Sequence, residues 1–98
     1  MPLKAAVLEV EFRIPAADSL KAKRSVLRSI LDGAHRRFGV AVAEVDRQDL
    51  WDESVVAFAT VSASVTQVTD ALDTVDRFVW SFPEIEVVDA IRYWVDTA

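Results

Sequence analysis

Lysine and arginine side chains gather in one segment of this sequence, where they could bind an anion. Residues 13–37 contain seven of these cations and only two acids, Asp18 and Asp32. The seven are Arg13, Lys21, Lys23, Arg24, Arg28, Arg36 and Arg37. From residue 38 onward, three arginines stand against twelve acids, and the whole chain has a formal charge of −5. Because surface charges are usually mixed, a cationic segment on an acidic protein favours an anionic partner.

Part of this cationic segment coincides with the start of a predicted helix over residues 20–38. Lys21, Lys23 and Arg24 fall in its first turn, where the helix dipole is positive and acidic residues are preferred. Lys21, Arg24 and Arg28 share one flank, whereas Lys23 projects near the core side and is expected to reach water at the helix end. The sequence predicts an anion site, most readily for RNA phosphate, made of Lys21, Lys23, Arg24 and Arg28 with Arg13 as a flanking member. The alternative is a solvated helix face whose cations pair with acids of the sheet, such as Glu9 or Glu11.

Six elements are predicted to position these residues. They are a strand over 5–14, the helix over 20–38, strands over 40–45 and 54–62, a helix from 65 or 66 to 82, and a strand over 85–95. Ser19 is the expected N-cap of the first helix and Gly39 its stop, while Pro83 stops the second. The order βαββαβ predicts an α+β fold of the ferredoxin-like kind, a four-stranded antiparallel sheet with both helices on one face.

The 98 residues predict one domain over positions 1–98, because so short a chain has no room for a second core. No apolar run approaches the roughly 20 residues that a membrane span needs, so we expect no membrane partner. The opening residues lack the apolar core and cleavage site of a secretory signal, and the chain has no cysteine. These features favour a cytoplasmic protein.

Catalytic chemistry has little support in the residue types. The only histidine, His35, has no obvious nucleophile or orienting acid beside it and is predicted to be a surface residue. The acids Asp46, Asp49, Asp52 and Glu53 lack the spacing and glycine of a calcium loop, so a solvated loop is expected there. Both glycines belong to the first helix or its end, which excludes a glycine-rich phosphate loop. We therefore expect a non-enzyme with no catalytic residue, metal or cofactor.

The first helical motif is similar to one found in a known family. Residues 19–27, Ser-Leu-Lys-Ala-Lys-Arg-Ser-Val-Leu, resemble the Ser-Leu-Lys-x-Lys-Arg signature of the small bacterial YlxP-like proteins. The segments 42–45, 48–51 and 86–89 are also similar to that family. The resemblance implies a ferredoxin-like fold of uncharacterised function. Because such proteins are often encoded beside translation and ribosome-maturation genes, it also implies an association with RNA or a ribosomal particle. Asp18 and Trp80 depart from the usual pattern without disturbing the basic motif.

Binding of RNA on the open face of the sheet is not expected. Proteins of this topology that use that face stack bases on aromatic residues of the central strands. Here Glu9 and Glu11 face outward on the first strand and would repel phosphate. The third strand presents either Val55, Ala57 and Ala59 or Val56, Phe58 and Thr60. We also expect no readout of DNA sequence, since phosphate contacts carry no sequence information.

Exposed apolar residues suggest a second function, self-association. Trp80 falls on the polar sector of the second helix and is predicted to make a protein contact. Trp51 and Trp94 are expected to cover the edges of the sheet. The outward faces of the strands also contain valine and alanine, which favours a homodimer through the sheet face. The alternative function is therefore a homo-oligomeric interaction or small-ligand regulatory module, in which a partner subunit's acids would pair with the basic flank.

Overall fold

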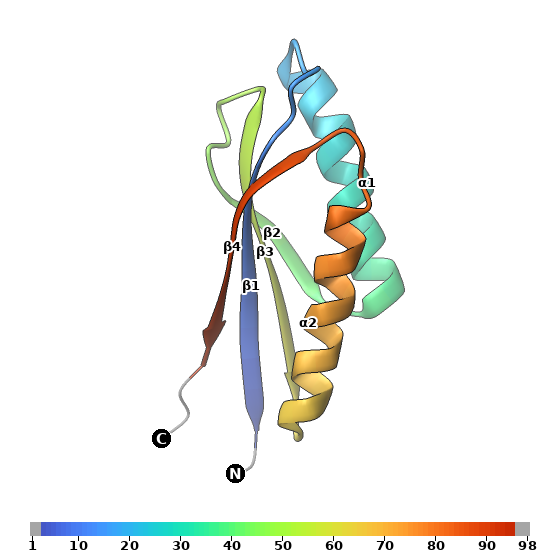
Figure 1. Cartoon of the computed structure of the whole chain (residues 1–98), viewed down its shortest axis with the longest axis vertical. Coiled ribbons are helices and arrows are strands. Elements are labelled where there is room, and N and C mark those ends of the chain that lie inside the picture. Colours follow the sequence, from blue (N-terminus) through green and yellow to red (C-terminus); the bar gives the residue numbers. More distant parts are fainter. Residues whose placement is uncertain (1–2, 96–98) are drawn as a thin grey trace.

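The computed structural model describes residues 3–95, which form one antiparallel sheet with two helices on one face (Figure 1). In chain order the elements are β1 (Lys4–Arg13), α1 (Leu20–Phe38), β2 (Ala41–Asp46), β3 (Glu53–Ser62), α2 (Val65–Trp80) and β4 (Glu86–Trp94). The strands lie side by side in the order β2-β3-β1-β4, so β1 and β3 are central and β2 and β4 are edges. The predicted ferredoxin-like sandwich is confirmed.

Strict alternation in β1 decides which face of the sheet carries the core. Leu8, Val10 and Phe12 are buried on the helix side, while Glu9 and Glu11 point to the open face. The facing residues of the helices complete the core, namely Leu27, Ile30 and Ala34 of α1 and Val68, Leu72, Val75 and Val79 of α2. Burial of this apolar surface is the main force that holds both helices on the sheet.

The helix ends follow the capping residues of the sequence closely. The Ser19 hydroxyl accepts a hydrogen bond from the Ala22 N–H at 3.1 Å, and Gly39 ends α1 with a left-handed φ of 67°. Only glycine adopts that conformation without a steric cost. The end of α2 differs from the prediction, because the helix stops at Trp80 and not at Phe82. The Ser81 N–H still bonds the Arg77 carbonyl at 3.1 Å, which satisfies the last turn.

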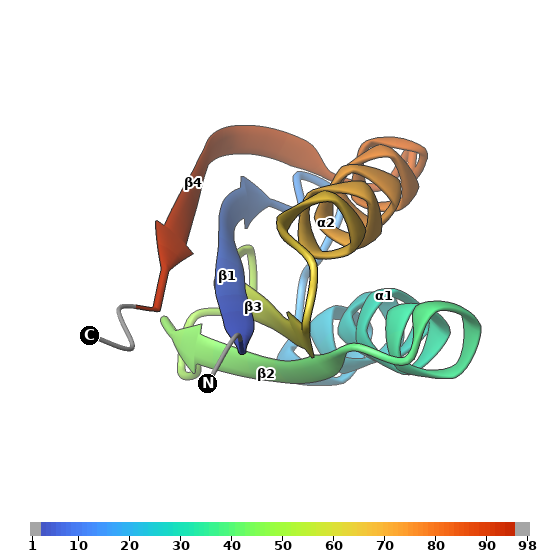
Figure 2. The same ribbon diagram turned by 90° about the horizontal axis from the view of Figure 1, so that it is seen from below.

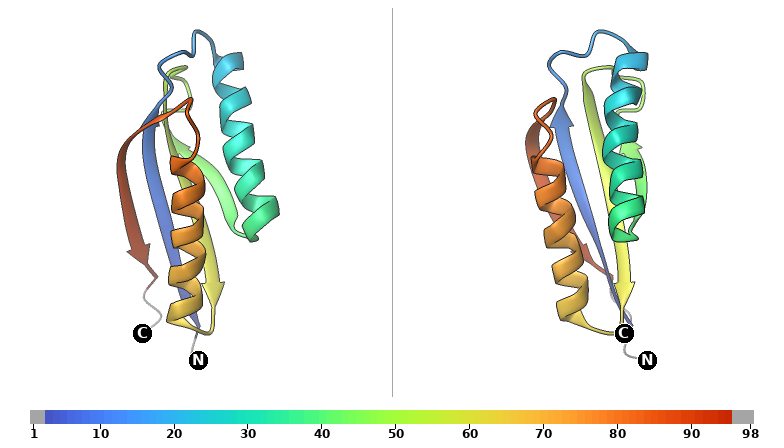
Figure 3. Two further views of the ribbon diagram at one scale, coloured as in Figure 1. Left: turned by 45° about the vertical axis from the view of Figure 1, so that its right-hand side comes forward. Right: turned by 90° about the vertical axis from the view of Figure 1, so that its right-hand side faces the viewer.

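The two helices cover different parts of the sheet (Figures 2 and 3). The main contacts join α2 to the central strands β1 and β3, and join α1 to the edge strand β2 and to α2. In Figure 2, β4 stands at the opposite edge from β2, and both faces of this strand are largely open to solvent. The structure therefore has a β2 side that is covered by α1 and a β4 side with little cover.

Within residues 3–95, no helix combines the length and the apolar character that crossing a bilayer requires.

Candidate anion-binding surface

Three cations form an exposed row along α1. Lys21, Arg24 and Arg28 are all exposed to solvent, as the helical wheel predicts. Within the part of the chain that the structure describes, none of the three forms an ion pair. We call these three residues the basic flank. Its charges are available to a partner, since no acid of the described chain neutralises them by contact.

The basic flank points away from α2, on the β2 side of the molecule. On the opposite side of α1, Gly33 packs so closely on α2 that an added Cβ would lie 2.8 Å from Cζ of Phe78. His35, in the same sector as the basic flank, has its Nδ1 3.0 Å from the carbonyl oxygen of Val40, just before β2. The basic flank therefore lies along the outer border of the fold, where a long partner could approach without meeting α2.

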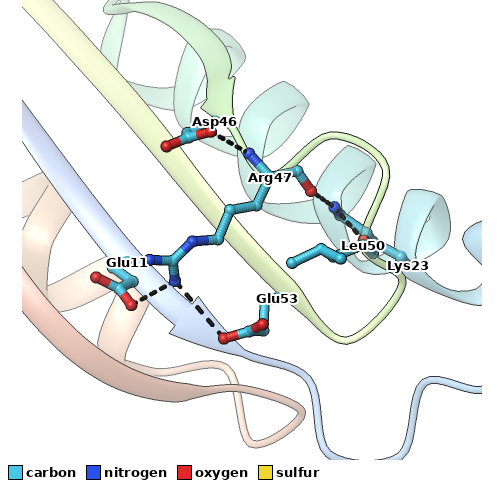
Figure 4. Close-up of polar contacts among 6 residues, drawn as sticks. All are labelled: Glu11, Lys23, Asp46, Arg47, Leu50 and Glu53. Carbon is cyan, nitrogen blue, oxygen red and sulfur yellow. Dashed lines mark hydrogen bonds and ion pairs between the residues drawn. The ribbon is translucent and has the colours of Figure 1, made fainter.

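Lys23 does not belong to this exposed row. Its side chain is only 1% exposed, so the expectation that its ammonium reaches water is wrong. Nζ donates to the carbonyl oxygens of Arg47 at 2.7 Å and Leu50 at 2.5 Å (Figure 4). It also lies 2.9 Å from Oε2 of Glu44. Two of the three donors of the ammonium are used by the carbonyls, and Glu44 provides its counter-ion.

The contacts of Lys23 extend into a buried polar network. Oε2 of Glu44 also accepts a hydrogen bond from the hydroxyl of Ser54 at 2.7 Å, and Ser54 is fully buried. Glu44 and Ser54 come from β2 and β3, on the face of the sheet that carries the core. Because a buried charge is tolerated only when it is paired and hydrogen-bonded, this arrangement explains how Lys23 can replace an apolar residue in the core. Lys23 fixes α1 to the β2–β3 connection.

The β2–β3 connection is shaped to receive Lys23. Arg47 has a left-handed φ of 61°, which is uncommon for a residue with a side chain. Its N–H is held by Oδ1 of Asp46 at 2.7 Å, and its carbonyl accepts from the N–H of Leu50 at 3.1 Å as well as from Lys23. This turn aims the carbonyls of Arg47 and Leu50 at the same ammonium (Figure 4).

The side chain of Arg47 reaches the open face of the sheet. Its Nη1 lies 2.5 Å from Oε2 of Glu11 and 3.6 Å from Oε1 of Glu53 (Figure 4). The hydrogen bond with Glu11 raises the pKa of Arg47 above its ordinary value. Glu11 is thus paired with Arg47 and not with a cation of α1. The alternative prediction, that cations of α1 pair with Glu11, is therefore wrong for this acid.

Arg13 lies apart from the basic flank. It is exposed at the end of β1 on the open face of the sheet, opposite the face that carries the helices. The strand register places it between Glu53 of β3 and Glu86 of β4, and these residues line one hollow with Asp52. The structure therefore does not bring Arg13 together with Lys21, Arg24 and Arg28, and its surroundings are acidic.

The open face of the sheet carries no aromatic residue on its two central strands. In β3 the outward residues are Val55, Ala57 and Ala59, the first of the two predicted sets, because they pair with Glu11, Glu9 and Val7 of β1. One half of this face is charged. The other half, toward the start of β1, holds a hollow of about 340 Å³ with a mainly apolar lining that includes Ala41, Ala59 and Val61. No stacking surface for bases exists on these strands.

The three tryptophans remain exposed. Trp80 is 60% exposed on α2, which agrees with its predicted place on the polar sector of that helix. Trp51, in the β2–β3 connection, and Trp94, at the end of β4, keep about half of their surface in solvent. That these two cover the edges of the sheet stays a prediction. Among residues 3–95, no three His, Asp or Glu side chains are gathered as metal ligands.

Comparison with known proteins identifies the family of this chain. Residues 5–92 match the family model described as "Protein of unknown function (DUF503)". The uncharacterised protein YlxP of Bacillus subtilis (strain 168) is 42% identical over 78 residues, which cover 80% of this chain and 85% of that protein. Among solved structures, the de novo designed protein Foldit4 superposes with a TM-score of 0.59, covering 91% of this chain and 96% of the design. At 15% identity, the design is similar in fold alone. The chain belongs to the DUF503 family, as its resemblance to the YlxP-like proteins predicts.

Proposed function

We propose that this protein is a non-enzymatic accessory factor that binds the phosphates of RNA, free or in a ribosomal particle, through the basic flank of α1. The single observation that carries the proposal is the exposure of Lys21, Arg24 and Arg28 without an ion-pair partner among residues 3–95. A protein with a formal charge of −5 gains nothing in solubility from a separate cationic row. Binding of an anionic partner would account for the separation of this cationic row from the acidic rest of the surface.

Phosphate is the anion that fits the row best. The first turn of α1 contains no acid, so the positive end of the helix dipole adds to the field of Lys21 and Arg24. Arg28 extends the positive charge along the helix axis, which suits a chain of phosphates better than a single small anion. Lys23 contributes through structure, because its contacts with the β2–β3 connection hold the first turn in place while its ammonium is unavailable to a ligand.

Binding of this kind would be weakly selective for sequence. Contacts to phosphate fix the position of a protein on a nucleic acid, while base edges carry the sequence information. The basic flank consists of long cationic side chains. On the open face of the sheet, β1 and β3 carry no aromatic residue on which a base could stack. Recognition of one RNA among many would then come from the shape of a folded RNA or from protein neighbours in a particle. A cytoplasmic location fits such a partner.

A capture experiment tests this function. The tagged protein is recovered from bacterial lysate with and without ribonuclease, alongside the double variant Lys21→Glu/Arg24→Glu. We expect RNA or ribosomal particles with the unmodified protein, loss after ribonuclease if the RNA is free, and strong reduction in the variant. The variant should fold normally or gain a few tenths of a kcal/mol, because acids suit the first turn of a helix.

The matched control is Lys4→Glu/Arg77→Glu, which makes the same change in net charge at two exposed positions away from the basic flank. This control should keep its RNA. If it loses RNA as strongly as Lys21→Glu/Arg24→Glu does, only net charge matters and the basic flank has no special role. Equal binding by all three proteins would reject the proposed function.

A further inference from the structure

Strand β4 is unusually bare for an element of a folded domain. Of its nine residues only Val87 is partly shielded, and all the others are exposed. The large apolar side chains exposed along the strand and just after it are Val88, Ile91, Tyr93, Trp94 and Val95. The register places Ile91 and Tyr93 on the open face of the sheet and Trp94 on the helix face, so both faces of β4 expose large apolar side chains. Exposed apolar surface of this kind marks a contact surface more often than a solvated one.

The backbone of β4 also has an open hydrogen-bonding side. The N–H of Val95 donates to the carbonyl of Ala5 at 2.9 Å, so this residue faces β1. Because consecutive residues of a strand direct their N–H and C=O groups to opposite sides, those of Ala90, Arg92 and Trp94 face away from β1. The N–H of Ala90 contacts only the carboxylate of its own neighbour Asp89, at 2.9 Å. Such an edge can accept another strand.

The other edge of the sheet is protected. Strand β2 has six residues, carries Glu44 and Asp46, and is interrupted by a bulge between these two positions. Shortness, charge and bulges are the usual devices that prevent pairing at an edge. Strand β4 is longer, and its irregularity lies near its beginning, between its partners for Glu11 and Phe12 of β1. Strand β4 also carries charged residues, Glu86, Asp89 and Arg92, and one bulge, but its segment 90–94 after the bulge contains only Arg92. The longer stretch without these devices is therefore at the β4 edge.

Charge identifies the strand that would pair with β4. Residues 87–95 contain one acid, Asp89, and one base, Arg92, so the segment is neutral on a chain of charge −5. Two copies of this chain repel each other over most of their surfaces but not over residues 87–95, which include all of β4 except its first residue, Glu86. We propose that β4 of one copy pairs antiparallel with β4 of a second copy, which joins the two sheets into one of eight strands.

In the proposed pair, Ile91 lies on the two-fold axis. Ile91 is the midpoint of residues 87–95, and pairing about it sets Ala90 opposite the partner's Arg92 and Asp89 opposite the partner's Tyr93. Pairing about Asp89 or Arg92 would instead bring two like charges together, which is unfavourable. The N–H and C=O groups of Ile91 point toward β1 and away from the second copy. Ile91 and Ile91 of the partner subunit therefore form a non-hydrogen-bonded pair, with Cα atoms about 4.5 Å apart.

The dimer leaves the basic flanks free. A two-fold axis perpendicular to the sheet keeps the helices of both copies on the same face, and β2 with α1 stands at each outer end (Figure 2). The inference is independent of the proposed RNA function, because it rests on the opposite edge of the sheet.

A chain without cysteine allows a direct test by disulfide crosslinking. The variant Ile91→Cys introduces a single thiol on the axis, at a separation within the range of about 4.4–6.8 Å that disulfides span. Val61→Cys, in an exposed position on β3, reports packing of two open faces, and Val45→Cys reports pairing at the β2 edge. We expect rapid formation of a covalent dimer with Ile91→Cys and little with the other two. Preferential crosslinking at Val61 or Val45, or none at any position, would overturn the proposal.

A second pair of variants tests the noncovalent dimer. Ile91→Lys places two ammonium groups together on the axis, whereas Val61→Lys adds the same charge on the same face of the sheet, away from β4. Light scattering at micromolar concentration should show a dimer for the unmodified protein and for Val61→Lys, and a monomer for Ile91→Lys. A monomeric unmodified protein, or a dimer that survives Ile91→Lys and dissociates with Val61→Lys, would contradict pairing through β4.

Discussion

The two sides of this domain differ in what covers their edge strands. On the β2 side, α1 packs against a short acidic strand, Lys23 joins the helix to the β2–β3 connection, and the basic flank faces solvent. On the β4 side, a longer strand carries exposed isoleucine, tyrosine, tryptophan and valine. The β2 side is polar, its buried polar groups are hydrogen-bonded or ion-paired, and its surface is cationic. The other is apolar and has unpaired backbone groups.

This difference shows how one small fold can present two unrelated surfaces. The cations of the β2 side remain exposed because Lys23, and not Lys21 or Arg24, supplies the charge that the interior of this side requires. Among residues 3–95, the β4 side has no equivalent internal network, since the ion pair of Arg92 with Asp73, at 2.7 Å, is at the surface. We infer that the first surface suits a charged polymer and the second suits another strand.

The largest effect is expected from removing the internal charge of the β2 side. Lys23→Met keeps the length of the side chain but leaves the two carbonyls without their donor and Glu44 without its counter-ion. We expect a loss of about 3 kcal/mol in the free energy of unfolding, near the lower end for a broken buried pair because Glu44 retains some contact with solvent. Chemical denaturation measures this loss.

The matched control is Lys21→Met, in the same helix turn but exposed. Its stability should stay within about 0.5 kcal/mol of the unmodified protein, as is usual for surface substitutions. Equal stabilities for the two methionine variants would mean that Lys23 does not hold α1 to the β2–β3 connection.

The next effect tests whether the two sides cooperate. A dimer carries two basic flanks, and linking two binding sites raises the apparent affinity for a ligand long enough to reach both. We expect Ile91→Lys to bind a long RNA at least about tenfold more weakly than Val61→Lys does, while both bind a short oligonucleotide equally. Fluorescence anisotropy with the two RNA lengths provides the measurement. If the length of the RNA makes no difference, the two sides act separately.

The smallest effect concerns the outer member of the polar network. Ser54→Ala removes one hydrogen bond to Glu44 while the Lys23 contacts remain, so a loss of about 1 kcal/mol is expected. Combined with Lys23→Met, the loss should be less than additive, because Glu44 is common to both contacts. Strict additivity in thermal or chemical unfolding would argue against a connected network.

The sequence predicts the fold well because its signals are local. The alternation of β1 and the caps Ser19 and Gly39 determine which residues face the core and where α1 ends. The role of Lys23 was missed, because a lysine near the core side of a helix end usually reaches water. Its partners are the main-chain carbonyls of Arg47 and Leu50, more than twenty residues away in sequence. A helical wheel contains no information about such partners.

The exposure of β4 also escaped prediction. Its pattern of valine, isoleucine, tyrosine and tryptophan is that of a strand in any position of a sheet. Only the arrangement of α1 and α2 over the other three strands shows that β4 is uncovered. The signal that could have indicated it is the order βαββαβ itself, which places the last strand at an edge.

The salt dependence of RNA binding shows whether the cations of the basic flank contact phosphate. Affinity for a single-stranded RNA should fall with salt concentration because bound phosphates release counterions. If Lys21, Arg24 and Arg28 each neutralise one phosphate, a plot of log affinity against log salt has a slope of about −2 for the unmodified protein. With Arg28 as the only remaining cation, Lys21→Glu/Arg24→Glu should give a slope no steeper than about −0.7. The same slope for both proteins, or affinity that does not change with salt, would contradict the role of the basic flank.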